Sequence, residues 1–149
     1  MDVRRDSVLP ELRNTERGAG GEMTFGFIPK HPVVQDLCNG FWKLYEPLFY
    51  DAPDKRSWII PKGFLTDFGS VPAVVDWIIP SIETIADPAY ILHDYHYAQH
   101  RAGKDETVSR RDADEILRAA LLVCGVGRVK AGIIYWAVRA GGSMAWERD

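Results

Sequence analysis

Three helical patterns in the C-terminal half constrain the fold of this 149-residue chain more than any other feature. Within 109–121, apolar residues recur every three to four positions, which is the spacing of a helix with one buried face. Ser109 stands three residues before Asp112, and this spacing is typical of a capping box at a helix start. Further helical patterns lie over about 87–101 and about 128–140. The short connections between the three predict helices that pack as antiparallel neighbours.

The first of these helices holds three of the four histidines of the chain, in "ADPAYILHDYHYAQH" (86–100). Asp87 is a suitable N-cap and Pro88 suits the first helical position, so this helix is expected to begin there and to run to about Arg101.

The N-terminal half has strand patterns instead. The segments 41–50 and 57–66 are rich in aromatic and β-branched residues, and the turn residues 51–55 between them predict a hairpin. Pro61 cannot donate a hydrogen bond, which favours an edge position or a bulge. The segment 66–72 is expected to be a loop and 73–80 a short apolar helix or turn. The expected class is α+β: a small antiparallel sheet or hairpin followed by a C-terminal three-helix region, in one domain over 23–149 with a flexible arm over 1–22.

Composition and charge narrow the function. The net charge of −3 argues against a nucleic-acid binder with a basic surface. No segment has the roughly 18 consecutive apolar residues of a membrane span, and the charged N-terminus is not a signal peptide. Cys38 and Cys124 fit no metal or disulfide spacing, so we expect two free thiols and synthesis in a cytoplasm.

The first two helices predict a histidine site. His93 and Tyr97 are four residues apart and share a face of their helix, while Asp94 points about a quarter turn away. An antiparallel second helix can direct Asp112 or Asp114 toward His93. A carboxylate on one imidazole nitrogen fixes the tautomer and stabilises the imidazolium, which is the arrangement of an oriented general base. The same residues are also compatible with a polar network that only specifies the fold.

Zinc is a second chemical possibility. His93, His96 and His100 form H-x-x-H-x-x-x-H, and pairs of them have helical spacing suitable for a zinc ion. A zinc-dependent cell-wall peptidase is therefore an alternative function, although no H-E-x-x-H motif is present.

The pattern Asp87, His93, Asp94 and Tyr97, followed by the helix "SRRDADEILRAALL", resembles the active-site helix pair of phospholipase A2, including the phospholipase domains of parvovirus capsids. The resemblance implies that His93 activates water and that Asp114 supports it, with Tyr97 in the same network. It also implies that Asp94 is a calcium ligand.

The glycine-rich calcium loop of those enzymes is missing from this chain. The nearest candidate is "TDFGSVP" (66–72), in which Asp67 and Ser70 are possible oxygen ligands for calcium.

A wider resemblance covers about residues 40–140. "G-F-x-T-D-F-x-S-V-P" (63–72), "LHDYHY" and "SRRDAD" are similar to a family of small proteins of unknown function found in tailed phages and prophages. This similarity implies a product of a phage, made in the cytoplasm of the host bacterium and linked to the virion, the tail, host penetration or lysis. Its expected partners are other virion or tail proteins or the lipid of the bacterial envelope.

The function expected from these features is a phage hydrolase that resembles phospholipase A2 and cleaves lipid esters. The alternatives are a virion or tail component without catalytic activity and the zinc peptidase. The third helix mixes basic and apolar residues, and it is expected either to pack in the core or to lie on a membrane surface.

Overall fold

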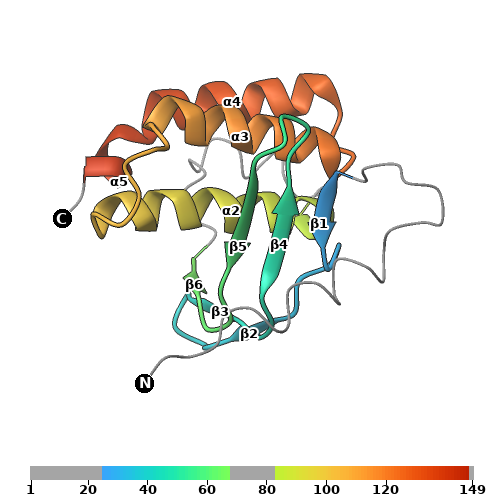
Figure 1. Cartoon of the computed structure of the whole chain (residues 1–149), viewed down its shortest axis with the longest axis vertical. Helices are drawn as coiled ribbons and strands as arrows, with labels where there is room; N and C mark the ends of the chain where they lie inside the picture. The colour runs from blue at the N-terminus through green and yellow to red at the C-terminus, as the bar shows by residue number, and fades with distance from the viewer. Residues whose placement is uncertain (1–24, 68–82, 148–149) are drawn as a thin grey trace.

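The computed structural model describes residues 25–67 and 83–147. Within these ranges the chain forms two three-stranded antiparallel sheets followed by helices, which confirms the α+β class (Figure 1). The strands are β1 (Gly26–Ile28), β2 (Val34–Asp36), β3 (Trp42–Leu44), β4 (Leu48–Asp51), β5 (Ser57–Ile60) and β6 (Leu65–Thr66). The helices are α2 (Glu83–Arg101), α3 (Arg110–Val123), α4 (Arg128–Gly141) and α5 (Ser143–Glu147).

The predicted hairpin is present, but each of its arms is divided between two sheets. The strands β4 and β5 pair with Tyr50 opposite Trp58, and β3 pairs with β6 farther from the turn. The divisions contain Pro47 and Pro61, and a proline has no N–H for a strand ladder. One long hairpin therefore contributes to both sheets, whose strand orders are β1-β4-β5 and β2-β3-β6.

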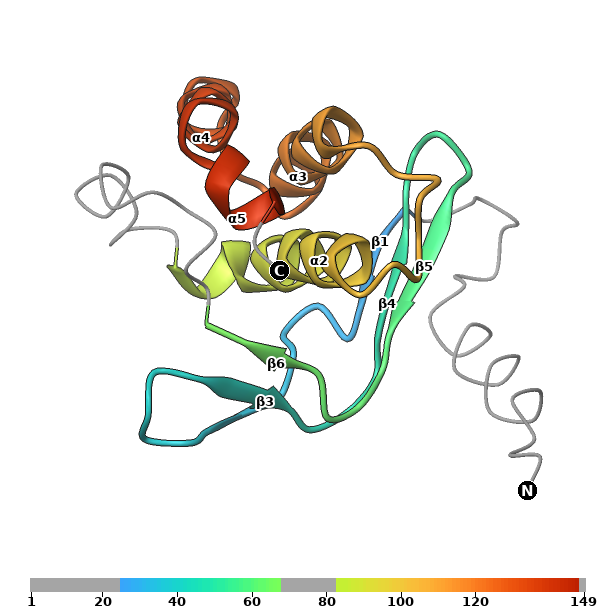
Figure 2. The same ribbon diagram turned by 90° about the vertical axis from the view of Figure 1, so that its left-hand side faces the viewer.

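Helix α2 lies at the centre of the molecule. Figure 2 shows α3 and α4 on one side of α2 and the strands on the other sides. The side chains of Ala86, Ala89 and Leu92 are completely buried, as are Leu48 and Ile60 of the β1-β4-β5 sheet. Burial of side chains on several faces of α2 holds its polar residues, including His93, in the interior.

The second and third helices begin and end close to the predicted positions. Ser109 is the N-cap of α3: its hydroxyl accepts a hydrogen bond from the Asp112 N–H, and the Asp112 carboxylate accepts one from the Ser109 N–H. This reciprocal pair confirms the predicted capping box. Helix α4 ends at Gly141, one residue beyond the prediction.

The predicted start of the first helix is wrong. Helix α2 begins at Glu83, so Pro88 lies inside it instead of at its first position. An interior proline removes one backbone hydrogen bond of the helix. Pro88 and its neighbour Ala89 are buried, and tertiary packing of this kind outweighs local propensity.

Two predicted segments lie outside the described residues. They are the arm at 1–22 and most of the 66–80 stretch, including Ser70 and the expected short helix at 73–80. In the part of the chain that is described, no helix combines the length and the apolar composition needed to cross a membrane.

Candidate functional site

His93 of α2 and Asp114 of α3 face each other between the two helices. The His93 Nε2 lies 2.8 Å from the Asp114 Oδ1, and both side chains are completely buried. Of the two aspartates considered from the sequence, Asp114 makes this contact, while Asp112 belongs to the capping box. Asp112 and Asp114 have different partners because side chains two residues apart are separated by about 200° around the helix axis and so lie on nearly opposite faces.

Asp114 accepts hydrogen bonds from two further side chains. The Tyr97 hydroxyl donates to Oδ1 at 2.8 Å, and the Arg139 Nη1 of α4 donates to Oδ2 at 2.9 Å. Burial alone raises the pKa of Asp114, but the hydrogen bonds from His93, Arg139 and Tyr97 outweigh it and leave this pKa below its usual value. Asp114 is therefore a carboxylate that joins three helices.

This carboxylate decides the tautomer of His93. An ionised aspartate only accepts hydrogen bonds, so the His93 Nε2 must carry the proton between them. In neutral imidazole the other nitrogen, Nδ1, then has a free lone pair. The Nδ1 atom is buried and has no hydrogen-bond partner among residues 25–67 and 83–147. It is thus a basic atom whose orientation is fixed by its opposite nitrogen.

Asp94 lies on a different side of α2 and contacts the sheet. Its Oδ2 accepts a hydrogen bond from the hydroxyl of Thr66 in β6, and both residues are buried. This contact brings the start of the predicted 66–72 loop to the histidine helix, with Asp67 exposed at its beginning. The sequence pattern drew attention to Asp67 and Ser70, yet the residue that meets Asp94 is Thr66. In the sequence, the only indication that Thr66 belongs to the site is its position directly before Asp67.

The described residues do not by themselves complete a cation site. They contain no group of three or more His, Cys, Asp or Glu side chains suited to a metal ion. Calcium takes about six to eight oxygen ligands. Asp94 and Thr66 offer a carboxylate and a hydroxyl, and Ser70 lies outside the described residues.

The three histidines of α2 have different neighbours. His93 contacts Asp114, His96 meets the edge of Trp58 at 5.0 Å, and His100 stacks on Trp146 at 3.9 Å. Burial and, to a smaller extent, the nearby His93 lower the pKa of His96 to about 4. The three rings do not converge on one point.

The Tyr97 hydroxyl that bonds Asp114 lies against Gly142, directly after α4. A Cβ atom on Gly142 would lie 2.6 Å from the Tyr97 hydroxyl oxygen. The Trp146 ring of α5 covers Tyr97 edge-on, at 4.9 Å between centroids. Burial, followed by the charge of Asp114, raises the pKa of Tyr97, so its hydroxyl keeps its proton and remains a donor.

Sequence reasoning missed both Arg139 and Gly142 as members of this site. Arg139 was visible as a basic residue near the end of the third helix, but nothing in its spacing identified Asp114 as its partner. The pair "GG" at 141–142 gave the only signal for the close approach of Tyr97.

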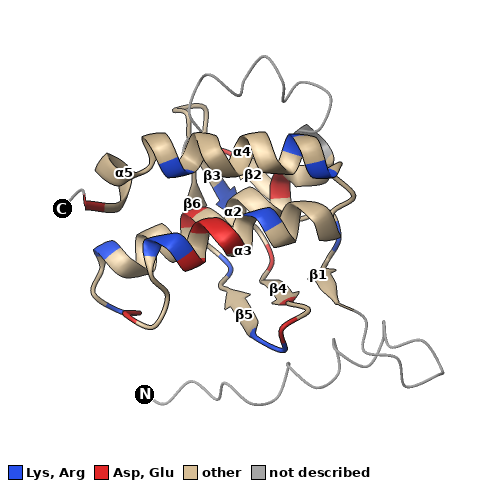
Figure 3. Cartoon of the chain, turned by 90° about the horizontal axis from the view of Figure 1, so that it is seen from above, with Lys and Arg blue, Asp and Glu red and all other residues tan. Residues whose placement is uncertain are grey.

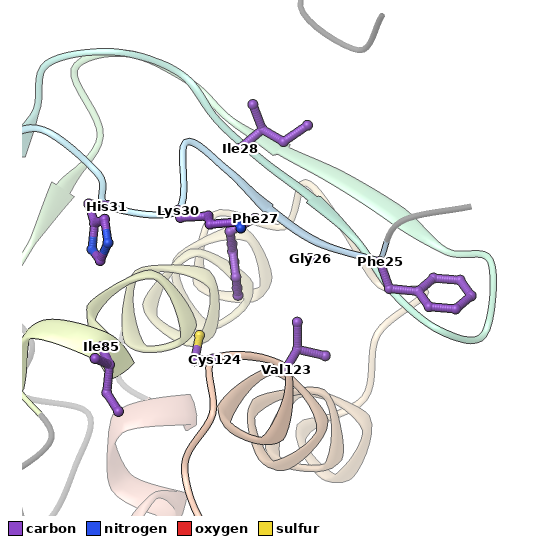
Figure 4. A pocket seen from close by; sticks show the side chains of 9 residues that line it. All are labelled: Phe25, Gly26, Phe27, Ile28, Lys30, His31, Ile85, Val123 and Cys124. Carbon is purple, nitrogen blue, oxygen red and sulfur yellow. The ribbon is translucent and has the colours of Figure 1, made fainter. Parts of the chain in front are cut away.

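A separate cavity of about 470 Å³ lies between β1 and the ends of α2 and α3 (Figure 4). Phe27, Ile85 and Val123 contribute apolar walls, and Lys30 lies at its edge. Burial raises the pKa of the Cys124 thiol in this cavity to about 11, which keeps it protonated. Ile85 is eight residues from His93, or about 12 Å along the helix. The cavity is therefore distinct from the His93 site.

Comparison with known proteins identifies the family and no relative of known activity. No curated protein and no solved structure matches the chain. Residues 42–138, about two thirds of the chain, match a family described as "Protein of unknown function (DUF1353)". This range nearly equals the segment over which the sequence resembled a family of unknown function. The matched range contains helices α2 and α3 and the paired strands β3 and β6, and it ends at Val138, one residue before Arg139. Because the match covers more than half of the chain, the chain belongs to the DUF1353 family.

Proposed function

We propose that the protein is a hydrolase of the phospholipase A2 type, in which His93 activates water for attack on a lipid ester. The observation that carries this proposal is the asymmetry of the His93 ring. Its Nε2 is held by Asp114 at 2.8 Å, while its buried Nδ1 has no partner within the described residues. An imidazole with one nitrogen held by a carboxylate and the other without a partner is the arrangement that a general base needs.

In the proposed reaction, Nδ1 takes a proton from water while the water oxygen attacks the ester carbonyl carbon. The imidazolium that forms is stabilised by the Asp114 carboxylate, which remains ionised. Nδ1 then returns the proton to the departing alkoxide oxygen as the C–O bond of the ester breaks. The products are a carboxylic acid and an alcohol, and His93 is again neutral.

Calcium belongs to the proposal as a prediction of its own. Asp94 is its expected ligand, together with Asp67 and Ser70 of the 66–72 segment. Bound there, the ion would polarise the ester carbonyl. Isothermal titration with Ca²⁺ tests this: binding by the wild type that is lost in Asp94→Asn supports the prediction, and no heat of binding contradicts it.

The phage setting is likewise proposed. A protein made in the host cytoplasm and carried by the virion or tail would meet the lipid of the bacterial envelope when the particle penetrates the host. The family description gives no activity, so this setting rests on the sequence similarity alone.

The test compares two buried histidines of the same helix. Fatty-acid release from phosphatidylglycerol vesicles is measured for the wild type, His93→Ala and the control His96→Ala, with circular dichroism to verify folding. We expect His93→Ala to lose about 10²–10⁴-fold in rate, the usual contribution of a general base. Turnover by His93→Ala at the wild-type rate would overturn the assignment.

A second candidate function is a non-enzymatic component of the virion or tail. The observation that favours it is the complete burial of the His93 and Asp114 side chains, which is typical of a polar network that specifies a fold. In this case His93→Ala lowers the melting temperature, and neither it nor the wild type releases fatty acid. The zinc peptidase has less support because the rings of His93, His96 and His100 do not converge on one point. Elemental analysis that finds one zinc ion per purified chain would favour this alternative again.

A further inference from the structure

The outer face of α4 carries a line of exposed apolar side chains. Val129, Ile133 and Trp136 are 77%, 43% and 69% exposed. They are spaced four and three residues apart, which places them along one face of the helix. We call these three residues the outer stripe. Met144 of the following helix α5 is also 73% exposed.

The outer stripe is not the core-facing side of the helix. Ala131, Ile134 and Val138 form that side and are completely buried. A helix at the surface of a domain normally has polar residues on its outward face. Exposed apolar residues that lie next to one another mark a surface that binds something apolar.

The charges around the outer stripe indicate what it binds. Helix α4 contains Arg128, Lys130 and Arg139 and no acidic residue, and since Arg139 is paired with Asp114, Arg128 and Lys130 are the basic residues beside the outer stripe. Arg128 is exposed next to Val129, and basic segments are visible at the beginning of α4 in Figure 3. On the adjoining α3, Arg118 is exposed and lies over the Tyr135 ring, at 5.8 Å from its centroid.

A tryptophan and aliphatic residues beside arginine and lysine are the combination found in helices that lie in the plane of a bilayer surface. The indole ring prefers the headgroup region, and each basic residue gains from the negative surface of anionic lipid. A second copy of this chain fits less well, because an α4–α4 contact would bring cations together without any acidic residue of α4 to pair with them.

We infer that α4 docks on the surface of an anionic phospholipid bilayer. The outer stripe enters the boundary between headgroups and acyl chains, and Arg128 contacts lipid phosphates. This inference depends on the surface of α4 and not on the chemistry of His93, so it stands or fails separately from the proposed hydrolase activity.

The experiment is co-sedimentation of the full chain with vesicles of phosphatidylglycerol or of phosphatidylcholine. The double variant V129S/W136S removes the two most exposed members of the outer stripe. The matched control is V33S/F41S, which changes a valine and an aromatic residue that are 49% and 43% exposed elsewhere. We expect the wild type and the control to bind phosphatidylglycerol, and V129S/W136S to bind at least roughly tenfold more weakly.

The charge contribution has its own variant. Arg128→Gln should weaken binding to phosphatidylglycerol by about fivefold, which corresponds to one lost basic contact with anionic lipid. The single changes Val129→Ser and Trp136→Ser repeat the test if the double variant is unfolded by circular dichroism. High salt should weaken binding by the wild type.

Three results overturn the inference. The first is a wild type that does not bind phosphatidylglycerol vesicles, and the second is equal binding by V129S/W136S. The third is a lipid-free dimer in sedimentation velocity that V129S/W136S abolishes, because the outer stripe would then be a contact between two copies of the chain.

Discussion

His93 and His96 lie three residues apart on α2 and are almost equally buried, at 1% and 2% exposure, but their hydrogen-bond partners differ. His93 donates through Nε2 to a carboxylate. His96 has neither nitrogen bonded to a described residue and meets Trp58 edge-on. Burial alone leaves His96 a neutral aromatic ring, whereas the buried carboxylate partner fixes the orientation and the tautomer of the His93 ring. The partner, and not the depth of burial, distinguishes a candidate active residue.

The partner of His93 should therefore be the most costly residue to remove. Asp114→Ala leaves Arg139, Tyr97 and the His93 Nε2 without their acceptor. We expect the free energy of unfolding to fall by about 3–5 kcal/mol, the usual cost of removing one member of a buried ion pair. Urea denaturation measures it.

The matched control for this change lies two residues earlier in α3. Asp112→Ala removes the capping-box carboxylate and should cost about 1 kcal/mol. Equal losses for Asp112→Ala and Asp114→Ala would contradict the central place of Asp114 in the network.

The contribution of His96 to the free energy of unfolding should change at acidic pH. Its pKa is about 4 in the folded protein and about 6.5 in the unfolded chain, so the unfolded chain binds the proton first. The stability that neutral His96 provides is complete above pH 6.5 and is lost as the pH falls toward 4. At most about 3 kcal/mol is involved.

The variant His96→Phe keeps a ring beside Trp58 and removes the titration. Its unfolding free energy should depend less on pH between about 6.5 and 4 than that of the wild type. Asp114 affects stability at a lower pH than His96. Because its pKa is depressed in the folded protein, the stability that the Asp114 carboxylate provides is lost only as the pH falls below the usual aspartate range. Parallel pH curves for the wild type and His96→Phe would show that His96 is not desolvated.

The network around His93 also depends on a close approach that His96 does not need. Gly142→Ala places a Cβ atom 2.6 Å from the Tyr97 hydroxyl oxygen, and also 2.6 Å from the Val138 carbonyl oxygen. We expect a loss of about 1–3 kcal/mol in the free energy of unfolding, as for other overpacked sites.

Gly132→Ala, inside α4, is the control for this change at the C-cap of the helix. A Cβ atom at Gly132 has no neighbour within 4 Å, so alanine should stabilise α4 by about 0.5–1 kcal/mol. Thermal unfolding of the two variants should shift the melting temperature in opposite directions. A shift in the same direction for both would indicate that Tyr97 does not need the space at Gly142.

The sequence predicted local features of this fold and fewer of its tertiary contacts. Helices α3 and α4 and the capping box at Ser109 follow from residues close together in the chain. The start of α2 did not, because burial of Pro88 overrides its preference for the first turn. Pro61 indicated an interruption in the second arm of the hairpin, but no local pattern encodes that the two halves of each arm join different sheets.

The candidate site shows the same difference between features that local spacing predicts and contacts that depend on tertiary packing. The antiparallel helix pair limited the partner of His93 to two aspartates, since helix spacing restricts which side chains can face each other. Arg139 and Thr66 join the polar residues through α4 and β6, and their approach depends on packing between distant segments. Spacing along one helix carries no information on such contacts.

The most direct test of the central claim is the protonation state of the His93 ring, measured by ¹⁵N NMR on the folded protein at neutral pH. The wild type should show a protonated Nε2 and an unprotonated Nδ1 for His93, and Asp114→Asn should change this pattern while the His96 signals stay the same. A protonated Nδ1 with an unprotonated Nε2 in the wild type would contradict the assignment of His93 as a base oriented by Asp114.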